Sequence, residues 1–321
     1  MDSNHAVETA LGVLERGGLV ALPTETVYGL AANAENELAV RRIFAVKGRP
    51  STHPLIVHIA GAAAMASWAA SIPTVAYRLA EAFWPGPLTL VLPRSTRASD
   101  AVTGGQGTVA LRVPAHPLAL ELLRRFEGGG LAAPSGNRFG RVSPTCAEHV
   151  RADLGGDVDF VLDGGPCDVG VESTIVDVAS GVPALLRPGG LAVEEIERVL
   201  GHSLARVPVS DVRAPGMLPS HYAPRAGLAV VAAGQVRAQA ERLVGLGRQV
   251  AVLSADASEV PEGARHVAIP GDAVKLAQAL YALLRSVDAM GVDVMVMALP
   301  EAQGLGLAVQ DRLLRASAPR T

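Results

Sequence analysis

Three adjacent polar side chains follow a short apolar run near the start of the chain, in the sequence ALPTETVYGL at residues 21–30. A strand that only fills a core has no use for Thr24, Glu25 and Thr26, whereas a strand end that presents hydroxyls to a small ligand does. Similar polar clusters read KGRPSTHPLIVH, PSGNRFGRVSPT and VESTIVD, at residues 47–58, 134–145 and 171–177. Together these clusters predict one site for a nucleotide and a small polar acid.

Arg112 belongs to a stretch, residues 108–113, in which apolar and other side chains alternate. In a strand, this alternation places Thr108, Ala110 and Arg112 on one face. An arginine on an inner face needs an anionic partner, because burying it unpaired is costly. A carboxylate of the protein would serve, and so would a ligand carboxylate or phosphate, which matches the planar fork of the guanidinium. The sequence leaves both possibilities open.

Two basic residues, Lys47 and Arg49, follow a predicted helix at residues 39–46. They either complement the helix dipole at the surface or stand where the next buried strand begins. His58 lies inside that strand, where a histidine is more often a hydrogen-bonded core residue than a ligand. His53 and His58 have no third metal ligand nearby, so a zinc site is not expected.

The remaining hydroxyl clusters have two interpretations each. Ser135 to Asn137 suit a tight turn whose backbone N–H groups converge on an anion, or simply a turn. Ser143 and its neighbours could line the site or cap the next helix. The hydroxyls at residues 172–174 could line the site or merely end a sheet.

The composition limits the class of protein. The chain has 321 residues, enough for two domains, and 49% of them are apolar with only 3% aromatic, so Ala, Val and Leu build the core. A net charge of -3 argues against a protein coated for nucleic acid. Cys146 and Cys167 form no metal or disulfide motif, as in a reducing compartment. No signal segment and no sufficiently apolar run is visible, which predicts a cytoplasmic protein.

The element pattern predicts an α/β fold in two domains. Residues 1–206 form the first domain, whose core should be complete by residue 200, and residues 228–321 form the second. Residues 207–227 hold four prolines and two glycines without periodicity and form a linker. Helices are expected at residues 7–16, 39–46, 75–83, 194–200, 235–244, 273–290 and 308–316. Strands are expected at 19–22, 55–59, 88–92, 108–113, 158–162, 174–178, 228–232, 250–254 and 292–298.

The order of motifs along residues 7–200 closely resembles the YrdC-like family of threonylcarbamoyl-AMP synthases. These motifs are PTETVYGL, KGRPSTHPLIVH, PGPLTLVL, ALRVPAHP, APSGNRFGRVSPT, STIVD and LRPGG. The linker sequence APGMLPSHYAP and the second domain resemble the longer form of that family. The resemblance implies a YrdC-like twisted mixed sheet with flanking helices, followed by a smaller C-terminal Rossmann-like α/β domain.

The resemblance also implies a reaction, in which L-threonine, bicarbonate and ATP yield threonylcarbamoyl-AMP and pyrophosphate. Mg²⁺ would arrive with ATP, and the protein would supply no metal site. A separate tRNA threonylcarbamoyl-transferase complex would use the adenylate, with at most a weak direct contact to tRNA. The residues of the linker separately predict a lid over the site, because prolines stiffen it and Met217, His221 and Tyr222 can pack or form hydrogen bonds. The second domain would anchor the far end of this lid.

By the same resemblance, residues can be assigned to the two substrates. The threonine side would be contacted by Thr26, His58, Arg112, Ala133 and Ser173. The ATP side would be contacted by Arg49, His53, Thr108, Ser135, Ser143, Arg187 and Tyr222. Lys47, Arg49 and Arg112 would be catalytic through positioning and charge, since no covalent nucleophile is needed.

Two other functions fit a YrdC-like fold. One is a double-stranded-RNA or tRNA-binding module without synthase activity, against which the net charge and the few aromatics weigh. The other is a carbamoyl-transfer accessory, like the related domain of hydrogenase-maturation proteins, which carry zinc-finger modules that two cysteines cannot build.

Overall fold

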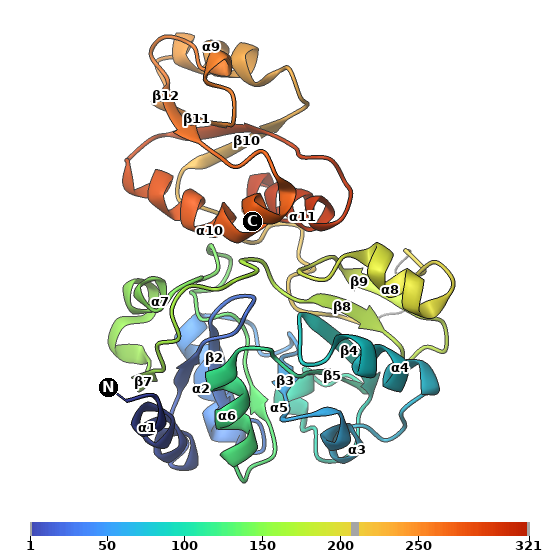
Figure 1. The fold of residues 1–321 in the computed structure, drawn as a ribbon. Coiled ribbons are helices and arrows are strands. Elements are labelled where there is room, and N and C mark those ends of the chain that lie inside the picture. Colours follow the sequence, from blue (N-terminus) through green and yellow to red (C-terminus); the bar gives the residue numbers. More distant parts are fainter. Residues whose placement is uncertain (1, 207–211, 320–321) are drawn as a thin grey trace. The chain divides into compact units, whose positions relative to one another are not determined.

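The computed structural model describes residues 2–206 and 212–319, which form two compact units (Figure 1). Unit 1 comprises Met1–Phe139 and Ser143–Met217, and unit 2 comprises Gly140–Val142 and Leu218–Thr321. The expected α/β class, with a twisted mixed sheet and a smaller α/β domain, is confirmed. Of the linker predicted at 207–227, residues 212–217 belong to unit 1 and residues 218–227 belong to unit 2. Its residues 207–211 lie outside the described part of the chain.

A nine-stranded mixed sheet forms the centre of unit 1, in the order β7-β1-β2-β6-β3-β5-β4-β8-β9. The pairs β1–β7, β3–β5 and β4–β8 are parallel, and the other neighbours are antiparallel. The strands are β1 (Val20–Leu22), β2 (Gly29–Asn33), β3 (Ile56–His58), β4 (Leu88–Pro93), β5 (Thr108–Arg112), β6 (Leu131–Ala132), β7 (Phe160–Val161), β8 (Thr174–Asp177) and β9 (Ala184–Arg187).

Eight α-helices and two short 3₁₀ turns are described in unit 1. They are α1 (Ser3–Glu15), α2 (Glu37–Lys47), η1 (Ala62–Ala64), α3 (Met65–Trp68), α4 (Thr74–Phe83), α5 (Asp100–Thr103), α6 (Pro117–Arg125), α7 (Ala147–Leu154), η2 (Gly155–Asp157) and α8 (Val193–Leu200). Helix α2 positions the site most directly. Asn36 caps its N-terminus by accepting a hydrogen bond from the backbone N–H of Ala39, and Gly48 ends it with φ 64°.

The sequence pattern missed several of these elements. It predicted no strand over Gly29–Asn33, because GLAAN lacks the β-branched and aromatic residues that mark strands, yet β2 pairs with both β1 and β6. It also predicted no helix at α6, where His116 accepts a hydrogen bond from the backbone N–H of Leu118 and Pro117 is the first helical residue. Helix α7 and strand β9 were missed too. Tertiary pairing outweighed local propensity at β2. Helix α6, in contrast, begins with local start signals that the pattern did not use.

Two apolar clusters support the sheet of unit 1. Helices α1 and α6 pack on the first strands through a cluster that includes Leu14, Leu22 and Leu122. A second cluster consists of Ile56, Val91, Ala110, Ile175, Leu186 and Ala214. Because Ala214 belongs to it, and Val212 and Met217 pack against it, the expectation that this core is complete by residue 200 is wrong.

Unit 2 is a parallel four-stranded sheet in the order β10-β13-β11-β12. Its strands are β10 (Gly227–Val231), β11 (Val250–Ser254), β12 (Arg265–Ala268) and β13 (Val294–Ala298), and β12 was not predicted. Helix α9 (Val236–Gly245) covers one face, and α10 (Ala273–Ala289) and α11 (Leu305–Ser317) cover the other (Figure 1). A 3₁₀ turn, η3 (Ala257–Glu259), follows β11. No helix among the described residues is long and apolar enough to cross a membrane.

Candidate functional site

Strands β3 and β5 bring two predicted site residues side by side. Their register pairs His58 with Arg112 and Ile56 with Ala110. Directly paired residues point to the same face of a sheet, and Thr108 joins that face two positions before Ala110. His58 and Arg112 are only 3% and 4% exposed, so this polar pair lies at the edge of the apolar cluster that contains Ile56 and Ala110.

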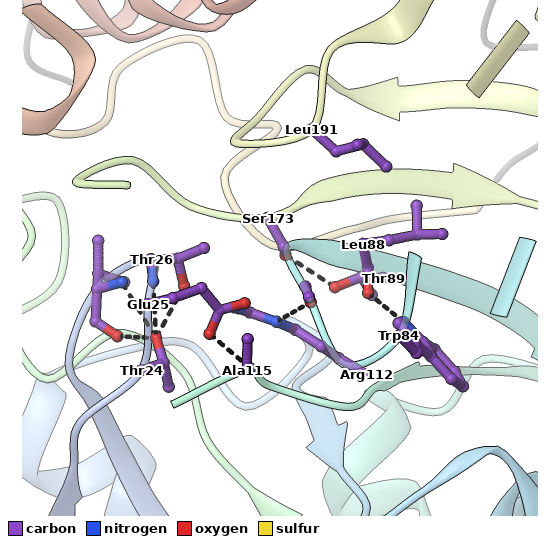
Figure 2. A network of polar contacts seen from close by, with 12 residues as sticks. Thr24, Glu25, Thr26, Trp84, Leu88, Thr89, Arg112, Ala115, Ser173 and Leu191 are labelled. Atoms are coloured by element: carbon purple, nitrogen blue, oxygen red, sulfur yellow. Dashed lines mark hydrogen bonds and ion pairs between the residues drawn. The ribbon is translucent and has the colours of Figure 1, made fainter. Parts of the chain in front are cut away.

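Arg112 forms a buried ion pair with Glu25, whose Oε1 lies 2.6 Å from Nη2 (Figure 2). The Nε–H of Arg112 donates to the carbonyl oxygen of Gly86 at 3.3 Å, and Oε2 of Glu25 accepts from the backbone N–H of Ala115 at 2.9 Å. Of the two partners that the sequence left open, the structure shows the protein carboxylate. No described residue accepts a hydrogen bond from Nη1, so this nitrogen remains available to a ligand.

His58 is held in its neutral form. Burial and the neighbouring positive charge of Arg112 lower its pKa to about 3, so the ring carries no charge at neutral pH. Its Nδ1 has no hydrogen-bond partner in the part of the chain that the structure describes. A buried ring nitrogen without a partner is costly, and a ligand hydroxyl could satisfy it.

Thr26 lies in a turn that is stiffened by hydroxyls (Figure 2). Thr24 Oγ1 donates to the carbonyl oxygen of Val27 at 2.6 Å and accepts from the backbone N–H of Thr26 at 3.2 Å. The two threonine hydroxyls are 2.8 Å apart. This local network explains why polar residues follow β1: they fix the turn that carries Thr26 and Glu25 toward β5.

Ser173 and Arg187 form a second polar group at the ends of β8 and β9. Nε and Nη2 of Arg187 donate to the carbonyl oxygen of Ser173 at 3.2 and 2.8 Å, and Nη1 donates to the carbonyl oxygen of Pro215 at 2.9 Å. The hydroxyls of Ser173 and Thr89 are 2.8 Å apart. Arg187 therefore connects a residue expected on the threonine side with the predicted linker.

Lys47 is buried at the end of α2 and holds the turn after β6. Its Nζ donates to the carbonyl oxygens of Ser135 and Asn137, each at 2.5 Å. Burial, together with the charge of Arg49, holds the pKa of Lys47 well below its usual value. No carboxylate of the described chain lies within ion-pair distance of Nζ, so the positive charge of this lysine is not neutralised by a direct partner.

Arg49 and His53 lie around the ring of Phe139. Arg49 donates from Nη2 to the carbonyl oxygen of Pro54 at 2.9 Å, and its guanidinium carbon is 5.9 Å from the centre of the Phe139 ring. The ring of His53 meets Phe139 edge-on at 5.7 Å. Burial and then the charges of Arg49 and Arg213 lower the pKa of His53, which favours its neutral form.

Ser143 donates from its hydroxyl to Oε1 of Glu172 at 2.6 Å, and both side chains are buried. Backbone hydrogen bonds join this segment to the first motif: the N–H of Tyr28 donates to the carbonyl oxygen of Pro144, and the N–H of Gly136 donates to that of Tyr28. The three motifs at residues 21–30, 134–145 and 171–177 are thus connected by hydrogen bonds.

Two residues were missing from the predicted assignments although their motifs were quoted. Glu25 and Glu172 each stand beside hydroxyl residues, in PTET and VEST, and each is paired with a predicted site residue. An acidic residue inside a buried hydroxyl motif was the available signal. Ala133 donates its backbone N–H to the carbonyl oxygen of Ile56, and it belongs to the apolar cluster that also contains residues of α1 and α6.

Tyr222, predicted to contact ATP, belongs to unit 2, whereas the other predicted ATP residues belong to unit 1. Its side chain is 1% exposed and stacks on Tyr281 at 5.9 Å between ring centres. The guanidinium of Arg312 lies over the same ring at 4.9 Å. Tyr222 has φ 61°, a conformation that non-glycine residues rarely adopt and that surrounding contacts must hold.

Comparisons with known proteins cover nearly the whole chain. Residues 12–189 match a family described as "Telomere recombination", and residues 191–318 match "Threonylcarbamoyl-AMP synthase, C-terminal domain". The chain is 45% identical to a threonylcarbamoyl-AMP synthase of Pyrococcus abyssi over 98% of this chain and 94% of the relative. It is 43% identical to that of Bacillus subtilis over 98% and 93%. The crystal structure of Pyrococcus abyssi Sua5 complexed with L-threonine is similar, with a TM-score of 0.91 and 42% identity over 97% of this chain and 94% of the other.

Proposed function

The chain belongs to the threonylcarbamoyl-AMP synthase family, and from that premise we propose that unit 1 binds L-threonine and ATP on the sheet face that carries His58 and Arg112. The enzyme is an L-threonylcarbamoyladenylate synthase, as its relatives are. We take its substrates to be L-threonine, bicarbonate and ATP, and its products threonylcarbamoyl-AMP, pyrophosphate and water. The observation that carries this assignment is the buried pair on β3 and β5, in which Nδ1 of His58 and Nη1 of Arg112 have no described partner.

The threonine half of the site follows from these contacts. Nη1 of Arg112 would bind the threonine carboxylate, and the neutral ring of His58 would bind a hydroxyl without adding charge. Thr26, Ser173 and the backbone near Ala133 would complete it. The related protein crystallised with L-threonine supports an amino acid as the ligand of this fold.

The ATP half would be formed by cations and hydroxyls at the other strand ends. Lys47 and Arg49 would face the phosphates, and Arg187 would approach them from β9. Thr108, Ser135, Ser143 and His53 would add hydrogen bonds. The burial of Lys47 supports this arrangement, because its Nζ has carbonyl partners but no carboxylate of the described residues at ion-pair distance.

The chemistry requires positioning more than a covalent intermediate. Threonine binds with an ammonium group, which must first lose a proton to solvent. The neutral amine then attacks bicarbonate with loss of water, or CO₂ with loss of a proton, to give a carbamate. A carbamate oxygen attacks the α-phosphorus while pyrophosphate leaves. Arg112 would hold the amino acid in line for this attack. Lys47 and Arg49 would stabilise the negative charge that develops on the phosphate oxygens.

Mg²⁺ would enter as the partner of ATP and neutralise part of the phosphate charge. The two buried carboxylates of the site already accept hydrogen bonds, Glu25 from Arg112 and Ala115 and Glu172 from Ser143. This donor set fits an ion held by phosphate oxygens and water rather than by a protein cage.

The product would be passed to a separate tRNA threonylcarbamoyl-transferase complex. A mixed anhydride of a carbamate and AMP is labile in water, so a lid that excludes water would protect it. We propose that the predicted linker is this lid. The enzyme itself would make at most a weak direct contact with tRNA.

Pyrophosphate release should depend on L-threonine and bicarbonate together. We expect purified protein with Mg-ATP to release little pyrophosphate when either is omitted, because the carbamate that attacks the α-phosphorus needs both. Coupled pyrophosphate detection and identification of the adenylate by mass spectrometry provide the measurement. ATP hydrolysis that ignores the amino acid, or tight RNA binding without pyrophosphate, would favour the RNA-binding alternative.

Tyr222→Phe tests the proposed contact of the linker with ATP. Phenylalanine retains the ring that packs against Tyr281 and Arg312 and removes only the hydroxyl. We expect the KM for ATP to rise by about 2- to 10-fold, the value of one neutral hydrogen bond, with the KM for threonine unchanged. Equal ATP constants in the variant and the wild type would leave this hydroxyl with no role at the nucleotide.

A further inference from the structure

Glu25 is a buried carboxylate of the site, and the reaction scheme gives it no role. Its side chain is 9% exposed and that of Arg112 is 5% exposed, so the ion pair between them is shielded from water (Figure 2). A buried pair of this kind is not evidence of stability by itself, because desolvation offsets much of the attraction between the charges. Its presence beside the proposed threonine site needs another explanation.

The contacts of Glu25 divide the guanidinium of Arg112 into two parts. Oε1 of Glu25 accepts a hydrogen bond from Nη2 at 2.6 Å, and the carbonyl oxygen of Gly86 accepts one from Nε at 3.3 Å. Only Nη1 is left without a described acceptor. The carboxylate of Glu25 therefore determines which edge of Arg112 faces a ligand.

Glu25 itself is fixed on three sides. Its Oε2 accepts from the backbone N–H of Ala115 at 2.9 Å, and its own carbonyl oxygen accepts from the N–H of Val169 at 2.8 Å. The adjoining turn is closed by the bond from Thr24 Oγ1 to the carbonyl oxygen of Val27. A ligand carboxylate can therefore bind beside Glu25 more easily than it can displace it.

The charges then restrict the class of ligand. Glu25 already neutralises Arg112, so a simple carboxylate would place two negative groups around one guanidinium. A zwitterionic amino acid adds an ammonium group with its carboxylate, and the negative charge of Glu25 attracts that group.

We propose that Glu25 is a positioning residue that orients Arg112 and makes the amino-acid half of the site selective for α-amino acids over simple carboxylates. The proposal rests on the assignment of threonine to this site. It requires no new chemical step, since Glu25 acts on substrate binding through Arg112 and through its charge.

The test compares threonine with 3-hydroxybutyrate, which has the same carboxylate and hydroxyl but lacks the amine. In the wild type, 3-hydroxybutyrate should inhibit pyrophosphate release only at concentrations far above the KM for threonine. In Glu25→Gln, the KM for threonine should rise by about 10- to 100-fold, the range for a hydrogen bond to a charged group, with the KM for ATP within about 2-fold. The preference for threonine over 3-hydroxybutyrate should fall by about 10-fold, because the attraction for the ammonium is lost.

Glutamine is the informative substitution because it preserves the shape of Glu25. Its amide oxygen can accept a hydrogen bond, but its amide nitrogen can only donate. Glutamine therefore cannot accept through two separate atoms from Nη2 of Arg112 and from the N–H of Ala115, as Glu25 does. Glu25→Asp retains the charge but is one methylene shorter. This variant should raise the KM for threonine through misplacement of Arg112 and still prefer threonine over 3-hydroxybutyrate.

Glu35→Gln is the matched control. Glu35 also pairs with an arginine, Arg97, through both oxygens at 2.9 and 3.0 Å, but the pair is partly exposed and lies outside the proposed site. Its threonine and 3-hydroxybutyrate constants should equal those of the wild type. Thermal unfolding of each variant separates a binding defect from a loss of folded protein.

The outcomes separate this inference from the proposed function. A wild type that releases no threonine-dependent pyrophosphate would refute the proposed function. A wild type that does, with a Glu25→Gln variant that retains both the threonine KM and the preference over 3-hydroxybutyrate, would refute only the role of Glu25. If Glu25→Gln does not fold, the Glu25→Asp comparison still decides, because loss of the threonine preference with the charge retained contradicts the charge argument.

Discussion

Replacement of Arg112 with lysine is expected to raise the KM for threonine by an amount corresponding to about 2–3 kcal/mol, with little change in the KM for ATP. Lysine retains the charge, so it can still pair with Glu25. It lacks the planar fork, however, and cannot bind Glu25 through one nitrogen and a threonine carboxylate through another, as Nη2 and Nη1 of Arg112 can. Initial rates of pyrophosphate release at varied threonine and varied ATP give the two constants.

The control for this variant is Arg97→Lys, which alters an arginine–carboxylate pair with Glu35 in the same unit. Its threonine and ATP constants should match those of the wild type. If Arg112→Lys retains a normal KM for threonine, then Arg112 serves only as the counterion of Glu25, which is the structural alternative that the sequence left open.

Lys47→Met should have the largest effect on turnover. We expect kcat to fall by about 10²- to 10³-fold, the usual effect of removing one preorganised group that stabilises developing charge. The expected effect on the free energy of unfolding is the sum of two opposing contributions. Methionine leaves the carbonyl oxygens of Ser135 and Asn137 without their donor, but it also removes a charge that is costly to bury.

The pH dependence of stability gives an independent measurement for Lys47. Its pKa in the folded protein is below the usual 10.5, so between these two values the unfolded chain binds more protons than the folded one. The free energy of unfolding therefore contains a contribution that rises with pH through this window. The wild type should gain stability relative to Lys47→Met as the pH rises toward 10.5. Urea unfolding at several pH values measures this difference.

Lys275→Met is the natural control, because the sequence contains only these two lysines and Lys275 is exposed on α10. It should leave turnover and the pH dependence unchanged. Full activity in Lys47→Met would show that the buried ammonium only supports the turn after β6.

Local patterns in the sequence were sufficient for most single elements. The alternation at residues 108–113 placed Thr108 and Arg112 on one strand face, and the strand β5 has this form. The apolar runs located β11 and β4, and the helical pattern located α10 nearly to its ends. The ordered motifs carried the resemblance to the family, which the comparisons confirmed. Such signals depend on the nearest few residues, so they survive without knowledge of the fold.

The partners of these elements could not be found in this way. Arg112 pairs with Glu25 across 87 positions of sequence, and Lys47 holds a turn that lies 88 to 90 positions further on. Strand β2 exists because two neighbours pair with it, although its residues favour no strand. Likewise, Ala214 of the predicted linker is buried because it packs in an apolar cluster with residues that are distant from it in sequence. These residues are Ile56, Val91, Ala110, Ile175 and Leu186. Strand register and long-range burial are properties of the assembled sheet. The sequence alone therefore marked candidate site residues, whereas only the tertiary structure decided which of them meet and showed that Glu25, which had no assigned role, pairs with Arg112.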